Sequence, residues 1–279
     1  MTLALHDVTH TLRISPIFTF YVLCGLVVGG IFGLITFDVI DLGMTHFGES
    51  SHRTHDVTYG LLFTTLVVGV LVQLRRPVEQ VSAMAMALAP VAALFLAGLL
   101  ADNVDAVVKF NPLRYAAAVT VVAALLHPAG RAFFGSFRLS RVSWLLVGLV
   151  AIAAVPLLGS ASSNIDLQRT VTDGHSFMGH YGFIAAFSFT VIAVGLLASL
   201  RLDGWRVPAW VAGLLPVIVG TTSILYPDAV SSLDPGWAVA ATAWGAVFVV
   251  TAEVLRRAQN AALFSPLGSG RSETLIDAR

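Results

Sequence analysis

The chain has 279 residues, of which 57% are hydrophobic and 11% charged, and its 16 basic and 16 acidic side chains give zero net charge. An ordinary soluble domain carries roughly 25% charged residues, so this composition excludes a soluble globule and predicts an integral membrane protein. Zero net charge gives no indication of nucleic-acid binding. The single cysteine, Cys24, excludes an intrachain disulfide and a cysteine-based zinc or iron–sulfur site.

Eight apolar runs approach the length of about 20 residues that a helix needs to cross a bilayer. They predict an all-α, multi-pass protein with spans at roughly 16–37, 57–74, 81–101, 113–127, 142–160, 177–200, 207–226 and 236–255. The first run is too long for a cleavable signal peptide and is expected to be retained. Residues 1–15 are expected to form a cytoplasmic leader, and residues 258–279 a flexible cytoplasmic tail.

Arginine falls on alternate connections between these runs. The connections after the second, fourth, sixth and eighth runs contain Arg75 and Arg76; Arg131, Arg138 and Arg141; Arg201 and Arg206; Arg256 and Arg257. Short cytoplasmic connections retain Lys and Arg, so both termini are predicted in the cytoplasm and the other connections outside. The plasma membrane is the expected location.

The two halves of the chain resemble each other. A displacement of 126 residues superposes Leu74-Arg75 on Leu200-Arg201, Pro90 on Pro216 and Asp102 on Asp228. These matches predict two four-helix repeats, 16–127 and 142–257, with the same orientation in the membrane. In the first run, Gly25, Gly29 and Gly33 share one helix face and predict close packing of another helix there.

A dense polar cluster precedes the second run. Its candidate ligands are His46, Glu49, His52, His55 and Asp56. If the helix begins within the cluster, His52, His55 and Tyr59 fall on one face, and Asp56 can orient an imidazole as a hydrogen-bond acceptor. The alternative is an interfacial loop whose histidines face water.

A second cluster, Asp173 to Gly182, precedes the sixth run, which the repeat makes equivalent to the second. His175 and His180 are five residues apart, so both cannot point the same way on one continuous helix. His180 is the stronger candidate because it is flanked by Gly179 and Gly182 and lies at the edge of the apolar run. Both clusters are expected at the same extracytoplasmic face.

Two kinds of cofactor site use such histidines. Imidazoles from two helices can bind haem iron axially, for which the candidates are His52, His55, His180 and His175. Three or four imidazoles with a carboxylate can bind copper, iron or zinc, for which the candidates are His52, His55, His180, His46, Glu49 and Asp56. No hydrolase signature occurs, so no catalytic residue is assigned.

The segment Glu49-Ser50-Ser51-His52-Arg53 resembles the Glu-x-x-His-Arg pattern of haem A synthases, at the outer end of the second of eight helices. The resemblance implies that His52 is a haem ligand and that Glu49 is important for catalysis. That family also has histidines on its fourth, sixth and eighth helices. Here the sixth offers His175 or His180, the eighth offers none, and His127 lies at the inner end of the fourth. The chain is also similar to the copper-resistance D membrane proteins in its size and its outward histidines.

The leading hypothesis is a membrane protein that binds haem or a transition metal for electron transfer, cofactor maturation or metal handling. Whether it is an enzyme is left open. A multi-pass transporter or channel for a small solute or ion is the first alternative, because outer histidines and aspartates could line a vestibule. A subunit that assembles into a homo-oligomer or a larger membrane complex is the second, with the bilayer as its environment in every case.

Overall fold

The computed structural model describes residues 15–45, 53–105, 113–130, 135, 141–229 and 231–264, and for residues 32–45, 53, 113 and 262–264 it describes the backbone only. These residues form helices and no strand, which confirms the all-α prediction. The helices are α1 Pro16–Thr45, α2 Arg53–Leu71, α3 Val81–Leu100, α5 Leu113–Leu125, α7 Trp144–Thr170, α8 Gly174–Phe177, α9 His180–Ser199, α10 Arg206–Leu225 and α11 Pro235–Phe264, with short 3-10 turns η2 Val72–Leu74 and η3 Pro77–Gln80.

Six helical stretches are long and apolar enough to cross a bilayer. They are Thr54–Leu74, Pro77–Leu100, Trp144–Thr170, His180–Ser199, Arg206–Leu225 and Pro235–Ala261. Large apolar side chains such as Trp144, Val155 and Leu225 remain exposed on them, as expected of surfaces that contact lipid. The described helices are therefore those of a multi-pass membrane protein, as the composition predicts.

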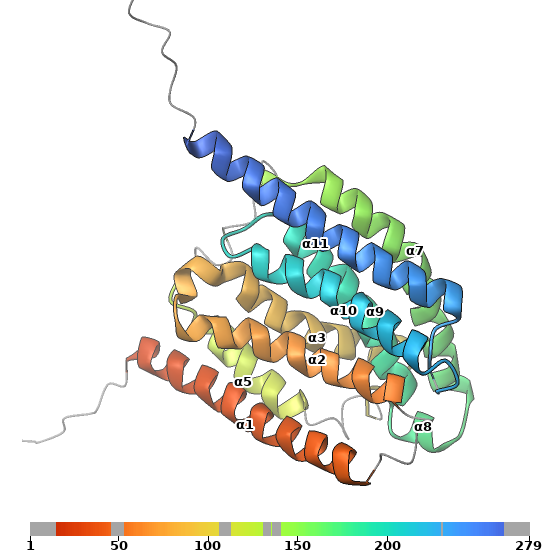
Figure 1. Cartoon of the computed structure of the whole chain (residues 1–279). Coiled ribbons are helices and arrows are strands. Elements are labelled where there is room, and N and C mark those ends of the chain that lie inside the picture. The colour runs from red at the N-terminus through yellow and green to blue at the C-terminus, as the bar shows by residue number, and fades with distance from the viewer. Residues whose placement is uncertain are drawn as a thin grey trace, which may run out of the picture.

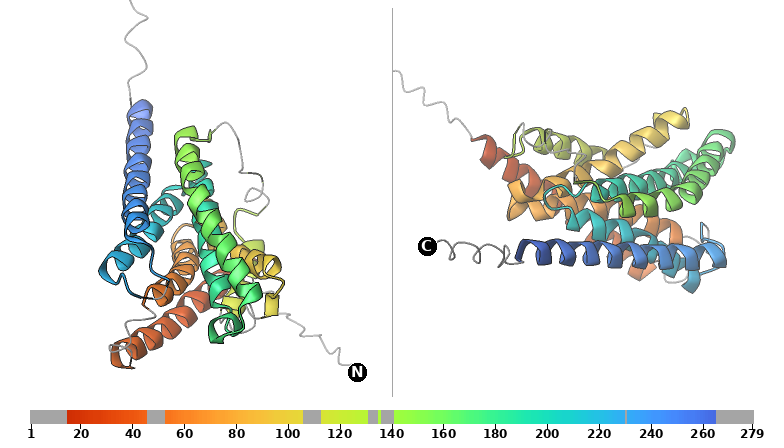
Figure 2. Two further views of the ribbon diagram at one scale, coloured as in Figure 1. Left: turned by 90° about the vertical axis from the view of Figure 1, so that its right-hand side faces the viewer. Right: turned by 90° about the horizontal axis from the view of Figure 1, so that it is seen from above.

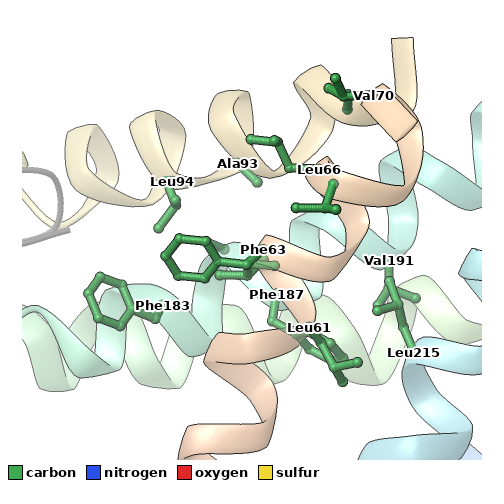
Figure 3. Packing of buried hydrophobic residues seen from close by; sticks show 14 of the residues in the cluster. Leu61, Phe63, Leu66, Val70, Ala93, Leu94, Phe183, Phe187, Val191 and Leu215 are labelled. Carbon is green, nitrogen blue, oxygen red and sulfur yellow. The ribbon is translucent and has the colours of Figure 1, made fainter. Parts of the chain in front are cut away.

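The centre of the bundle consists of α2, α3, α9 and α10 (Figure 1). Helices α1 and α5 pack on the α2–α3 side, and α7 and α11 pack on the α9–α10 side (Figure 2). Side chains of the central helices form the core, where Phe63 and Leu66 of α2 lie near Leu94 of α3 and Phe187 of α9 (Figure 3).

Small residues bring α10 and α11 into close contact. A Cβ at Gly220 would lie 2.5 Å from the Ala238 carbonyl oxygen, and one at Gly213 would lie 2.6 Å from the Gly245 carbonyl oxygen. At Gly25 and Gly29 of α1, by contrast, a Cβ would meet nothing within 4 Å. The prediction of close helix packing at these two glycines is wrong for contacts within the described chain.

Several helices extend beyond the apolar runs. Helix α7 continues to Thr170, α1 to Thr45 and α11 to Phe264, so the first residues of the expected tail are helical. Helix α2 begins at Arg53, inside the first polar cluster, which meets the condition for His55 and Tyr59 to share a helix. Hydropathy locates the apolar part of a helix, whereas the backbone hydrogen bonds continue until a cap or turn ends them.

Helices α2 and α9 terminate at one end of the bundle. Helices α3, α7 and α10 begin at that same end. We call it the arginine-rich end, because its described basic residues are Arg75, Arg76, Arg141, Arg201, Arg206, Arg256 and Arg257. Here buried Gln73 donates from Nε2 to the carbonyl oxygens of Gly69 (3.0 Å) and Gln80 (3.1 Å). Its Oε1 lies 3.2 Å from Nε2 of buried His127, so one amide joins α2, η3 and the segment after α5.

Candidate functional site

Three histidines meet at the opposite end of the bundle, which we call the histidine end. His55 lies in the first turn of α2 with 5% of its surface exposed, His175 lies on α8, and half-buried His180 is the first residue of α9. The ring centroids of His55 and His180 are 4.2 Å apart, and those of His175 and His180 are 5.5 Å apart. Histidines from both sequence clusters therefore form one group.

A break between α8 and α9 brings His175 and His180 together. Gly179 has φ 77°, in the left-handed region that glycine adopts without steric cost. This conformation ends the first short helix and starts α9 in a new direction. The stretch is not one continuous helix, so the divergence that a continuous helix would impose on His175 and His180 does not arise.

Helix α8 is fixed at its start by Asp173. Its carboxylate accepts from the Ser176 N–H at 2.7 Å, and the Ser176 hydroxyl oxygen accepts from the Asp173 N–H at 3.1 Å. This reciprocal capping box stabilises a helix of only four residues. The Ser176 N–H bond is the main reason that the pKa of Asp173 lies below its usual value of 3.8.

The same carboxylate approaches one of the histidines. Oδ2 of Asp173 accepts from the Tyr181 hydroxyl at 3.0 Å and lies 3.7 Å from Nδ1 of His175. At that distance it can attract a protonated or metal-bound imidazole. Asp173 and Tyr181 are therefore additional residues of this site, which sequence analysis placed in the cluster without giving them a role.

Gln168, near the end of α7, holds this region together and was missed by sequence analysis. It is 3% exposed. Its Nε2 donates to the Ser176 carbonyl oxygen at 2.6 Å, and its Oε1 accepts from the Gly182 N–H at 3.1 Å. One amide thus links α8 to the first turn of α9, on either side of His180. In the sequence, the only sign of this role is that Gln168 is a polar residue shortly after an apolar run.

Aromatic rings close the inward side of the group. The Phe183 ring lies 5.8 Å from His180 and stacks on Tyr59 at 4.9 Å, and Tyr59 contacts Phe63 edge-on at 4.9 Å. Tyr59 follows His55 by one turn of α2, as the sequence spacing predicts. The apolar wall separates the imidazoles from the core and lowers the local dielectric.

The start of α2 is also tied to the α10–α11 connection. The Thr54 and Ser232 hydroxyl oxygens are 2.8 Å apart, and the Ser232 hydroxyl donates to the Tyr226 carbonyl oxygen at 2.7 Å. Elements from both halves of the chain therefore position His55.

Among the other predicted ligands, Asp56 lies in the first turn of α2. His46, Glu49 and His52 lie outside the described residues. Within the described part of the chain, no three or more His, Cys, Asp or Glu side chains are arranged to hold a metal ion.

Ring spacing distinguishes between the two expected cofactors. With metal–nitrogen bonds of about 2.0 Å, two imidazoles on opposite sides of an iron have centroids roughly 6 Å apart, and adjacent ligands on one ion have centroids roughly 4 to 5 Å apart. The 4.2 Å separation of His55 and His180 falls in the second range, whereas the 5.5 Å separation of His175 and His180 lies between the two. The His55 and His180 rings therefore do not fit a porphyrin between them, and they are near the spacing of adjacent ligands.

Comparison of the chain with protein-family models, with curated proteins and with solved structures finds no match.

Proposed function

We propose that this chain is a multi-pass membrane protein that binds a transition metal ion through His55, His175 and His180 at its extracytoplasmic face. The observation that carries the proposal is the meeting of three imidazoles from α2, α8 and α9 within ring contact. Neutral imidazole is a suitable ligand for copper, zinc and iron. Metal binding requires the rings to turn until their nitrogens face one ion, because the described side chains are not yet arranged around one.

The proposal includes eight spans in two four-helix repeats. Helices α1 and α5 complete the predicted runs at 16–37 and 113–127. The pairs α1·α2, α2·α3, α3·α5 and α1·α5 in contact have the counterparts α7·α9, α9·α10, α10·α11 and α7·α11, also in contact. This correspondence supports the repeat, in which α2 and α9 are equivalent helices that both carry histidines at their first turn.

His52 is the expected further ligand, because it precedes His55 by three residues and an i, i+3 pair lies on one helical face. A carboxylate such as Asp173 can orient His175 from behind, which fixes the tautomer and strengthens the imidazole as a ligand. Metal handling, electron transfer and cofactor maturation all use such a site.

A measurement of bound metal tests the proposal directly. Detergent-purified protein is loaded with Cu(II) or Zn(II), desalted and analysed for metal, and its oxidised and dithionite-reduced absorption spectra are recorded. We expect about one ion per chain and at least a tenfold loss in a His55→Ala/His180→Ala variant. The matched control is His6→Ala/His10→Ala, which removes two histidines from the leader.

Equal metal content in the two double variants would refute the metal site. A Soret band that shifts on reduction would identify haem instead. It would then require a porphyrin position other than between His55 and His180.

Transport of a small solute is the second candidate. It is favoured by Pro90, Pro156 and Pro216, which lie inside α3, α7 and α10. A proline within a membrane helix removes a backbone hydrogen bond and permits bending. Uptake into proteoliposomes that is independent of bound metal would favour this function.

A further inference from the structure

A groove of about 500 Å³ runs along the surface between α2 and α10. Figure 1 shows these two helices side by side. The α2 wall includes Leu61, Thr64 and Val68, and the α10 wall includes Trp210, Leu214 and Ile218. Except near Arg206, the lining is almost entirely apolar, so the groove suits a hydrocarbon chain.

The groove has the length of one leaflet. Its α2 wall extends from Leu61 to Val72, which at 1.5 Å per residue is about 16 Å. A bilayer core is about 30 Å thick, so a groove of this length spans roughly half of it. A partner helix that crossed the whole membrane would need a longer contact surface.

The charged end of the groove is the arginine-rich end. Helices α2 and α10 are antiparallel, because Thr54 at the start of α2 bonds to Ser232 just beyond α10. Val72 and Arg206 therefore line the same end. The apolar part of the groove is complementary to an acyl chain, and its basic end is complementary to an anionic headgroup, so together they match a phospholipid.

Arg206 belongs to a cluster of three charged side chains, with Glu253 and Arg256. Glu253 of α11 accepts from Nε of Arg206 at 2.6 Å, from Nε of Arg256 at 2.8 Å and from Nε1 of Trp210 at 2.7 Å. Two guanidinium groups share one carboxylate, which leaves one positive charge uncompensated. The terminal nitrogens of Arg206 donate no hydrogen bond to any described residue, so they can donate to a phosphate.

We propose that this groove binds an anionic phospholipid of the leaflet at the arginine-rich end. One acyl chain lies between α2 and α10, and the phosphate accepts from the Arg206 guanidinium. Trp210 follows Arg206 by one turn of α10, so its indole ring would lie beside the headgroup, at the membrane interface that tryptophan favours. Basic grooves between membrane helices recognise anionic headgroups by the same combination of charge and apolar contact.

The test uses the full chain in nanodiscs of phosphatidylglycerol and phosphatidylcholine, followed by detergent extraction and mass spectrometry of the lipids that remain bound. We expect Arg206→Gln to reduce retained phosphatidylglycerol at least threefold relative to phosphatidylcholine. The matched control is Arg76→Gln, which removes an exposed arginine from the same end outside the groove. If both variants retain the same ratio as the wild type, the proposal is wrong.

A second variant tests the apolar part without changing charge. Leu214→Trp fills the groove, and Leu96→Trp places the same side chain on the exposed surface of α3. We expect only Leu214→Trp to lower total retained lipid.

A Thr64→Cys variant tests whether a second copy of the chain occupies the groove instead. Thr64 is exposed in the groove and the native Cys24 is buried, so only the introduced thiol can react. A disulfide that joins two copies through the introduced thiol would show that a second chain fills the groove, which would overturn the lipid assignment.

Discussion

The two ends of the bundle use histidine in opposite ways. At the arginine-rich end, His127 is the one histidine among the residues that the structure describes. Its Nδ1 accepts from the Ala129 N–H at 3.2 Å, and its Nε2 lies 3.2 Å from Gln73 Oε1. An acceptor at Nδ1 places the proton on Nε2, which donates to the amide oxygen. Both nitrogens are used by neutral partners, and the ring also packs edge-on against Phe20 at 5.4 Å.

At the histidine end, three imidazoles lie against one another beside the Asp173 carboxylate. Packing alone does not require this arrangement, because apolar side chains would fill the same space without the cost of burying polar rings. A buried histidine is thus structural where local donors and acceptors fix its tautomer. It becomes a candidate ligand where several imidazoles converge.

His127→Ala tests whether the histidine at the arginine-rich end is structural. The change removes the bond to Gln73 and leaves a cavity beside Phe20, so we expect a loss of roughly 1–3 kcal/mol in the free energy of unfolding. Metal content should not change. Denaturant titration in mixed micelles measures the first quantity, and elemental analysis measures the second. His127→Gln retains an amide donor and serves as the control, with a smaller loss expected. A fall in metal content with unchanged stability would reverse the roles assigned to the two ends.

Composition and periodicity predicted the class of fold, because apolar runs of membrane length have few alternatives in water or lipid. They also predicted that α2 could begin inside the first cluster and that Tyr59 would follow His55 on the same face. These inferences depend on local spacing, which the sequence contains directly.

The features that assemble the site depend on contacts between distant segments. The turn at Gly179 and the reach of Gln168 from α7 to α8 and α9 connect residues whose spacing carries no periodic signal. The open face at Gly25 and Gly29 shows the same limit, because small residues permit close packing without specifying a partner.

Gln168→Ala tests whether the hydrogen bonds at the histidine end hold His175 and His180 together. It removes the two hydrogen bonds that hold α8 to α9, so His175 should no longer be fixed beside His180. If these histidines bind a metal ion, we expect an affinity loss of about tenfold, typical of residues that support ligands. The measurement is competition for Cu(II) or Zn(II) with a chelator of known affinity. The control Asn164→Ala lies one turn earlier on α7 and removes a bond to the Ser160 carbonyl oxygen only. Equal affinities in the two variants would place metal binding elsewhere.

The smallest expected effect concerns the turn between α8 and α9. Alanine at position 179 must adopt the left-handed conformation, at a cost of about 1–2 kcal/mol. Gly174→Ala is the matched control, because a Cβ at Gly174 meets nothing within 4 Å and its backbone is helical. Strain at position 179 acts on the direction in which α9 begins, so it should increase amide hydrogen exchange in α8 and the first turn of α9 and leave α2 unchanged. Equal exchange in the Gly179→Ala and Gly174→Ala proteins would mean that the turn does not hold His175 and His180 together, and the convergence of the two sequence clusters would need another cause.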